Sequence, residues 1–111
     1  MGLRYKIWLE KDGELTLGDG LYELLQGIER LGSISQAAAA MRLSYREAWG
    51  RVRAAERRLG LHLLVTQVGG DEGGGTRLTP AARELLEKYG RFREEVNAAL
   101  QEIYQKYFQG E

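Results

Sequence analysis

Hydrophobic residues alternate with polar ones near the start of the chain and follow a helical spacing beyond it. Over residues 3–9 the apolar residues at every second position alternate with Arg4, Lys6 and Trp8, and this period of two predicts a half-buried strand. Residues 11–13 (Lys-Asp-Gly) predict a turn, and residues 15–17 predict a short second strand that pairs back. Over residues 21–31 leucines and an isoleucine recur every three or four positions, which predicts a core-facing helix that ends at Gly32.

The stretch 33–60 predicts two helices joined by a tight turn, and the rest of the chain is organised around it. Ser33 precedes an alanine-rich run and has the side-chain oxygen that an N-cap requires. Ser44 can cap a second helix, and Glu47 stands three residues further on, as in a capping box. Gly60 is a natural stop for that helix. Two short helices, a tight turn and a basic second helix are the pattern of a helix-turn-helix.

The second helix separates its apolar and charged residues onto opposite faces. At about 100° per residue, one face collects the expected buried stripe Ala48, Val52, Ala55 and Leu59. The opposite face collects Arg46, Gly50, Arg53 and Arg57. Residues 42–58 hold six arginines against two glutamates, and guanidinium groups bind phosphates and guanine edges through paired hydrogen bonds. A solvated face on an ordinary helix is the alternative, but the turn and the two caps favour DNA binding.

A hairpin is predicted after the second helix. Apolar and β-branched residues over 61–68 indicate a strand. Five of the eight residues 69–76 are glycine, which predicts a loop, and residues 77–78 can return as the partner strand. A helix-turn-helix followed by a hairpin with a glycine-rich tip is a winged helix.

The last predicted element is a long helix. Thr79 can cap it, and Pro80 takes the first helical position, where its missing N–H costs nothing. The helix can run to about Phe108, roughly 45 Å at 1.5 Å per residue. Such a helix cannot bury its whole apolar stripe against so small a domain, so we expect a dimer interface with a second copy. A shorter, bent helix folded onto its own core is the alternative. The stripe has nearly heptad spacing and comprises Leu85, Tyr89, Phe92, Val96, Leu100, Ile103 and Tyr107.

Composition limits the classes of function. Sixteen basic and sixteen acidic side chains cancel, so any positive surface must be local. There is no cysteine and His62 is the single histidine, so we expect no disulfide, no metal site and no cofactor. The carboxylates form no catalytic constellation, and we expect no enzyme activity. No apolar run of about 18 residues and no apolar leader occur, which predicts a cytoplasmic protein that does not contact membranes.

The whole chain resembles the N-terminal domain of the ModE family of molybdate-responsive transcription regulators, and its helix-turn-helix resembles LysR-type regulators more distantly. The resemblance is carried by residues 11–20, 32–52 and 69–86, and its most specific part is S-Y-x-x-A-W at 44–49. It implies a dimeric winged helix that binds operator DNA. In that family molybdate is bound by separate C-terminal domains. This chain stops at Glu111, so molybdate is not expected as a ligand of this chain.

The predicted fold is α+β, mainly α: a winged helix-turn-helix with short N-terminal strands, a β-hairpin wing and a long C-terminal dimerisation helix. We expect one domain over residues 1–111, with the helix-turn-helix at about 33–60, the wing at about 62–78 and the long helix at about 79–108. Asp71 and Glu72 would repel phosphate from the wing tip, so Arg77 at the wing base is the expected DNA contact there.

We expect a homodimeric transcriptional regulator that inserts its second helix into the major groove of an inverted-repeat, double-stranded operator. Tyr45 and Arg46, followed by Arg53, would read base edges, and other polar residues would hold phosphates. The alternative is a protein-interaction module whose arginine face binds an acidic protein partner. The complete set of expected DNA contacts is Ser35, Gln36, Arg42, Ser44, Tyr45, Arg46, Trp49, Gly50, Arg53, Arg57 and Arg77.

Overall fold

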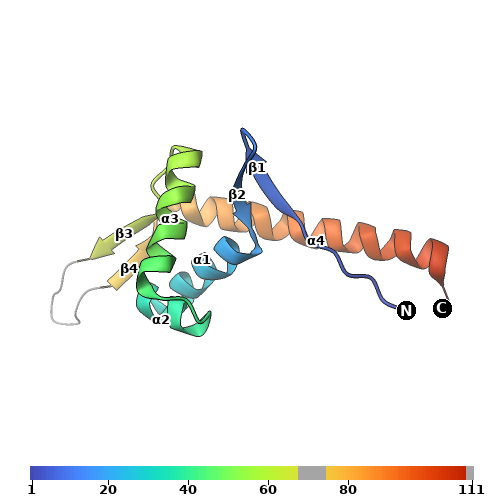
Figure 1. Ribbon diagram of the computed structural model, residues 1–111, viewed down its shortest axis with the longest axis horizontal. Coiled ribbons are helices and arrows are strands. Elements are labelled where there is room, and N and C mark those ends of the chain that lie inside the picture. Colours follow the sequence, from blue (N-terminus) through green and yellow to red (C-terminus); the bar gives the residue numbers. More distant parts are fainter. Residues whose placement is uncertain (68–74, 110–111) are drawn as a thin grey trace.

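The computed structural model describes residues 1–67 and 75–109. The glycine-rich tip expected for the wing, with Asp71 and Glu72, lies outside the described residues. The described chain is mainly helical, with two antiparallel hairpins (Figure 1). Its elements, in order, are β1 (Trp8–Lys11), β2 (Glu14–Gly18), α1 (Asp19–Leu31), α2 (Ile34–Ala40), α3 (Tyr45–Leu59), β3 (Leu64–Gln67), β4 (Gly75–Leu78) and α4 (Pro80–Phe108).

The predicted helix-turn-helix is present as α2 and α3, packed on α1. The Ser33 side chain accepts a hydrogen bond from the Gln36 backbone N–H at 3.2 Å, which starts α2 as expected. Small residues set the close approach of α1 and α2, because a Cβ added at Gly27 would lie 3.0 Å from the Ala37 Cβ. Within the apolar stripe of α1, Leu24, Leu25 and Ile28 are fully buried, whereas Leu31 at the end of the helix is exposed.

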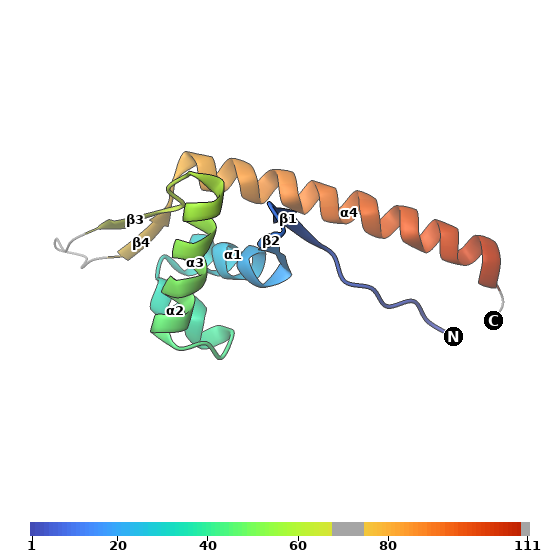
Figure 2. The same ribbon diagram turned by 45° about the horizontal axis from the view of Figure 1, so that its top comes forward.

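The first hairpin differs from its prediction. The expected strand over residues 3–9 is wrong for most of its length, because β1 covers Trp8–Lys11 and pairs with β2 across a bulge. Residues 1–7 form no strand and run beside α4 (Figures 1 and 2), where the Tyr5 hydroxyl donates a hydrogen bond to Asn97 Oδ1. An alternation of residue types also fits an extended segment that lies on a helix. The sequence pattern therefore does not show whether such a segment pairs with another strand.

The second hairpin forms the base of the predicted wing. β3 and β4 pair antiparallel, with Leu64 opposite Leu78 and Gln67 opposite Gly75. The predicted strand over 61–68 starts too early, because Leu63 is fully buried and turns its backbone N–H toward α3 rather than toward a strand. The Thr76 N–H donates to the Gly32 carbonyl at 3.1 Å, which fixes the wing base against the end of α1.

The last helix, α4, is continuous over Pro80–Phe108, so the alternative of a shorter, bent helix is wrong. The Thr79 side chain accepts a hydrogen bond from the Ala82 N–H at 3.1 Å and caps it as predicted. Figures 1 and 2 show α4 extending well past the other elements. The radius of gyration is 16.8 Å, against about 13 Å for a compact chain of roughly 100 residues. No helix in the described residues combines the length and hydropathy needed to cross a membrane.

Candidate nucleic-acid interface

Helix α3 begins with a complete capping box. The Glu47 N–H donates to Ser44 Oγ at 3.0 Å, and the Ser44 N–H donates to Glu47 Oε1 at 3.1 Å. The backbone hydrogen bond from Ser44, supported by its hydroxyl, lowers the pKa of the Glu47 carboxyl. This reciprocal cap fixes the first turn, from which Tyr45 and Arg46 project as exposed side chains.

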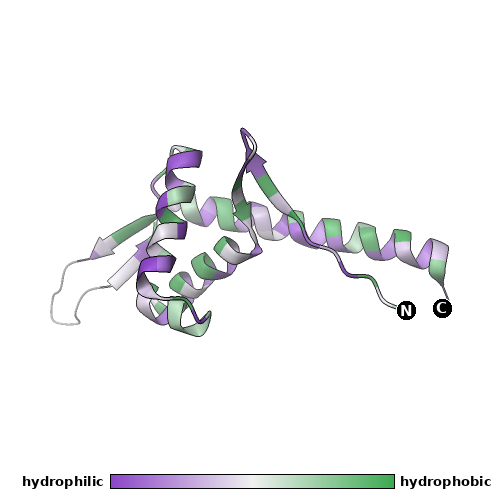
Figure 3. Ribbon diagram, viewed as in Figure 1, coloured by the Kyte–Doolittle hydropathy of each residue, from purple (hydrophilic) through white to green (hydrophobic). Residues whose placement is uncertain are grey.

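The two faces of α3 are divided as predicted. Ala48, Val52 and Ala55 are buried, whereas Leu59 is only half-buried. The opposite face is exposed, and Figure 3 shows several hydrophilic residues along the α3 ribbon. Gly50 on this face has no neighbour within 4 Å of an added Cβ, so packing within the described chain does not require glycine there. A glycine inside a helix costs about 1 kcal/mol relative to alanine, and here it leaves the helix backbone open to an external group.

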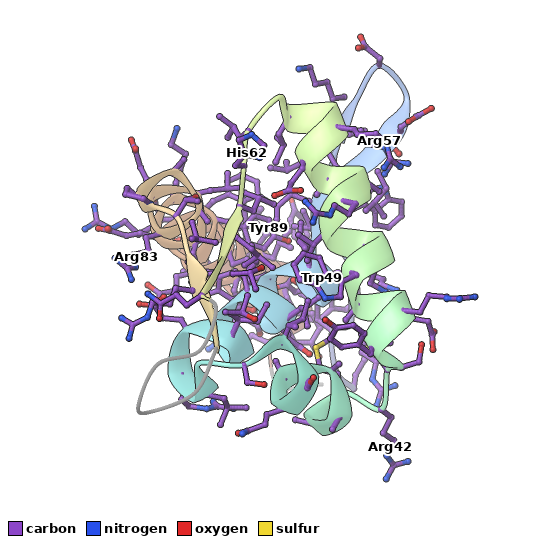
Figure 4. All side chains as sticks on the ribbon, turned by 90° about the vertical axis from the view of Figure 1, so that its left-hand side faces the viewer. Arg42, Trp49, Arg57, His62, Arg83 and Tyr89 are labelled. Carbon is purple, nitrogen blue, oxygen red and sulfur yellow. The ribbon has the colours of Figure 1, made fainter. Side chains whose placement is uncertain are left out.

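The arginines near α3 divide into two groups. Arg58 joins the helix to the first hairpin, through Glu14 Oε2 at 2.9 Å and the Leu15 carbonyl. Arg53 pairs with Glu56. Arg42, Arg46, Arg51 and Arg57 form no ion pair with a carboxylate of residues 1–67 or 75–109. In Figure 4 Arg42 and Arg57 lie toward opposite ends of α3, with Trp49 between them. The unpaired guanidinium groups therefore follow the length of the helix.

Glu56 is a structural residue that the sequence did not reveal. Its side chain is only 9% exposed and accepts hydrogen bonds from the Leu63 N–H at 2.8 Å and from Arg53 Nη1 at 3.0 Å. Burial acts to raise the pKa of the Glu56 carboxyl, but these hydrogen bonds and the Arg53 charge outweigh it and hold the pKa below its ordinary value. Glu56 thus ties α3 to the segment that leads into the wing.

The turn between α2 and α3 contains a second unpredicted feature. Arg42 has φ of +58°, in the left-handed region that favours glycine. The turn is held by the Leu43 N–H, which donates to the Ala38 carbonyl at 2.9 Å, and by the Arg42 N–H, which donates to the Ala39 carbonyl at 3.0 Å. A sequence signal for this geometry would be glycine, and arginine stands there instead, with an exposed side chain.

The expected DNA contacts come from the helix-turn-helix and the wing base. Ser35 and Gln36 are exposed on α2, Arg77 is exposed on β4, and Arg42 lies in the turn. Trp49 is half-buried against the core, unlike the other members of the set, which are exposed. The members that share α3 or its cap are Ser44, Tyr45, Arg46, Trp49, Gly50, Arg53 and Arg57. In the described residues no group of three or more potential metal ligands occurs.

The expected dimer stripe becomes more exposed along α4. Leu85 is half-buried and Tyr89 is buried, where its hydroxyl donates to Asp19 Oδ1 at 3.2 Å. Burial, with the Asp19 charge, raises the pKa of the Tyr89 hydroxyl. Val96 and Leu100 are half-buried. Phe92, Ile103 and Tyr107 are 38%, 53% and 68% exposed. The stripe is therefore part core and part uncovered apolar surface.

A capped helix-turn-helix with a hairpin wing and an arginine-bearing second helix defines the class of winged-helix DNA-binding proteins. The family model described as bacterial regulatory helix-turn-helix protein, lysR family, matches residues 21–83, more than half of the chain. The chain belongs to this family of DNA-binding transcription regulators.

Regulators of the ModE type are similar to the chain in sequence. The chain is 35% identical over 98 residues to the molybdenum transport protein ModE of Azotobacter vinelandii. This match covers 88% of the chain and 36% of the relative. The chain is 42% identical over 66 residues to the transcriptional regulator ModE of Haemophilus influenzae. This match covers 60% of the chain and 26% of the relative. The chain thus spans about a third or less of the length of these relatives. The resemblance inferred from the sequence is confirmed.

A solved structure supports the same fold. The DNA-binding domain of CbnR, crystallised as a complex with DNA, superimposes with a TM-score of 0.62 at 20% sequence identity. The match covers 79% of this chain and 95% of the CbnR domain. The predicted α+β, mainly α winged helix is therefore confirmed as the fold.

Proposed function

We propose that the chain binds double-stranded DNA as a homodimer, with α3 in the major groove of an inverted-repeat operator. The observation that carries the proposal is the exposed arginine face of α3, which starts at a rigid capping box. Two-fold symmetry places the two half-sites about one helical turn of DNA, or a multiple of it, apart. Tyr45 and Arg46 then read base edges, and Arg53 follows about two turns further along the helix.

The remaining expected contacts fit a role in positioning. Arg42 and Arg57 carry guanidinium groups that no described carboxylate neutralises, and phosphate oxygens are suitable partners for them. The Ser44 oxygen accepts from Glu47, so its hydroxyl proton stays available for a phosphate. Ser35 and Gln36 on α2 contact phosphates of the DNA backbone next to the groove, and Arg77 contacts the DNA from the wing base. We assign the chain no catalytic role.

The uncovered part of the α4 stripe supports the homodimer. Residues 1–7 cover one side of α4, where the Tyr104 hydroxyl donates to the Met1 carbonyl. Ile103 and Tyr107 remain more than half exposed beside this segment. Apolar side chains in a nearly heptad row are typical of a helix that pairs with another helix. The whole of residues 1–111 then acts as one DNA-binding and dimerisation domain in the cytoplasm.

Titrations of the purified chain test the proposal. One uses random duplex DNA and the other the DNA upstream of its own gene, each at low and high salt, with and without molybdate. We expect binding that prefers one sequence, weakens with salt and does not respond to molybdate. Absence of binding to either duplex at low salt would overturn the proposal and favour binding of an acidic protein by the arginine face.

Arg46→Ala should relax sequence specificity. Loss of a bidentate base contact is expected to cost about 1–3 kcal/mol at one operator position and little elsewhere. Arg57→Ala is the matched control, because a lost phosphate contact should weaken all sequences alike and reduce the salt slope by about one counterion. Binding of an operator library by both variants measures the difference. Equal weakening on every sequence by Arg46→Ala would show that Arg46 contacts phosphate only.

Arg42→Gly should make the protein more stable while weakening its binding to DNA. Removing a non-glycine residue from the left-handed region is expected to stabilise the fold by about 0.5–1 kcal/mol after the entropy of glycine is included. Urea denaturation measures the stability, and titration with duplex DNA measures the affinity. Arg42→Ala is the control, because it keeps the backbone strain and loses the same guanidinium. A glycine variant that is less stable than Arg42→Ala would contradict this account of the turn.

A further inference from the structure

Three side chains form a continuous stack along α3. The Tyr45 and Trp49 rings meet edge to face, with centroids 6.4 Å apart and planes at 74°. The Arg53 guanidinium lies 4.7 Å from the centre of the Trp49 ring, and Glu56 Oε1 holds Arg53 Nη1 at 3.0 Å. Each member is thus fixed by the next, and the stack is anchored at Glu56, which is itself bound to the Leu63 N–H.

The outer end of this stack is an aromatic ring that is mostly exposed. Tyr45 is 58% exposed and stands directly after the N-cap, in the first turn of α3. Its hydroxyl forms no hydrogen bond within the described residues. Trp49 behind it packs partly against the core, so the pair is a rigid apolar projection at the start of the helix. An exposed, rigid apolar projection of this kind can pack against an apolar group of a ligand.

The major groove of DNA offers one apolar group at base edges, the C5-methyl of thymine. Every other edge presents hydrogen-bond donors or acceptors, which an aromatic edge satisfies poorly. We propose that Tyr45, supported by Trp49, recognises a thymine methyl group in each half-site, with Glu56 as a positioning residue that holds Arg53 against the Trp49 ring. This inference rests on the proposed DNA-binding function, and it specifies one base that the site must contain.

Replacement of thymine by deoxyuridine tests the proposal, because it removes the methyl group and leaves all hydrogen-bonding groups in place. The preferred duplex is first selected from random sequences with the unaltered chain. Each thymine is then replaced in turn, symmetrically in both half-sites, and affinity is measured by fluorescence anisotropy. At one thymine position we expect affinity to fall about four-fold per half-site, the loss corresponding to one buried methyl-sized group.

Variants show whether Tyr45 is the partner of that methyl group. Tyr45→Ala should bind the thymine and deoxyuridine duplexes with equal affinity at the sensitive position. Arg57→Ala, the matched control, should bind both duplexes more weakly and keep the same ratio between them. Tyr45→Phe should also keep the ratio, since the ring and not the hydroxyl makes the contact.

Two results would overturn the proposal while leaving DNA binding intact: no thymine position that responds to deoxyuridine, or an undiminished response in Tyr45→Ala. Failure of the unaltered chain to bind any duplex would instead overturn the proposed function, and this inference with it. The two failures are therefore distinguishable in one series of titrations.

Discussion

Ile103→Glu is expected to convert the dimer into a monomer and to lower operator affinity by about 100-fold or more. Ile103 is 53% exposed in the single chain and lies in the apolar stripe of α4, so a carboxylate there would be buried without a partner at a paired interface. A dimer binds its second half-site as an intramolecular event, and a monomer loses that gain. Light scattering measures the oligomeric state, and titration with an inverted-repeat duplex measures the affinity.

Gln101→Glu is the matched control for this prediction. It adds the same charge two residues away on α4, about 200° around the helix and thus away from the stripe. Gln101 is exposed, so we expect an intact dimer with unchanged affinity. A dimer that persists in Ile103→Glu would show that the second copy does not pack on this part of α4. Circular dichroism checks that α4 remains helical in both variants.

Glu56→Ala is expected to reduce the free energy of unfolding by about 1–3 kcal/mol, because it leaves the Leu63 N–H without its acceptor. That N–H belongs to a fully buried residue and donates to Glu56 at 2.8 Å. Urea denaturation measures the loss. Glu95→Ala, which removes an exposed glutamate from α4, should change stability by less than about 0.5 kcal/mol. Similar values for the two variants would refute a structural role for Glu56.

The lowered pKa of Glu56 also predicts how stability depends on pH. The unfolded chain holds the proton at this carboxyl more tightly than the folded chain does, so acid favours unfolding. The contribution of Glu56 is complete above the ordinary glutamate pKa of about 4.3 and is lost as the pH falls through the lower folded value. Stability of Glu56→Gln, measured from neutral pH to pH 3, should lack this part of the decline. Parallel pH curves for the two proteins would contradict the prediction.

The elements that the sequence predicted correctly are those specified by residues close together in the chain. Ser44 and Glu47 are three positions apart, and they form the capping box that the spacing indicated. Gly32 and Gly60 adopt the left-handed conformation that ends α1 and α3. The helical spacing along α3 also separated its buried and exposed faces correctly. The edge-to-face contact between the Tyr45 and Trp49 rings also joins residues close together in the chain, but the sequence analysis did not predict it.

Contacts between distant residues were decided by the tertiary structure alone. Residues 1–7 alternate like a strand, yet they lie along α4, because β2 pairs with no more of the chain than Trp8–Lys11. Arg58 contributed to the positive charge counted over residues 42–58, but Glu14, 44 positions away, holds it against the first hairpin. The sequence by itself determined the helices, the side-chain caps of α2, α3 and α4 and the arginine-bearing face, since these depend on periodicity and local hydrogen bonds. Only the tertiary structure decided which arginines remain available for a ligand. Packing places carboxylates and carbonyls near some arginines, which are then paired, and leaves the others free of such partners among the described residues.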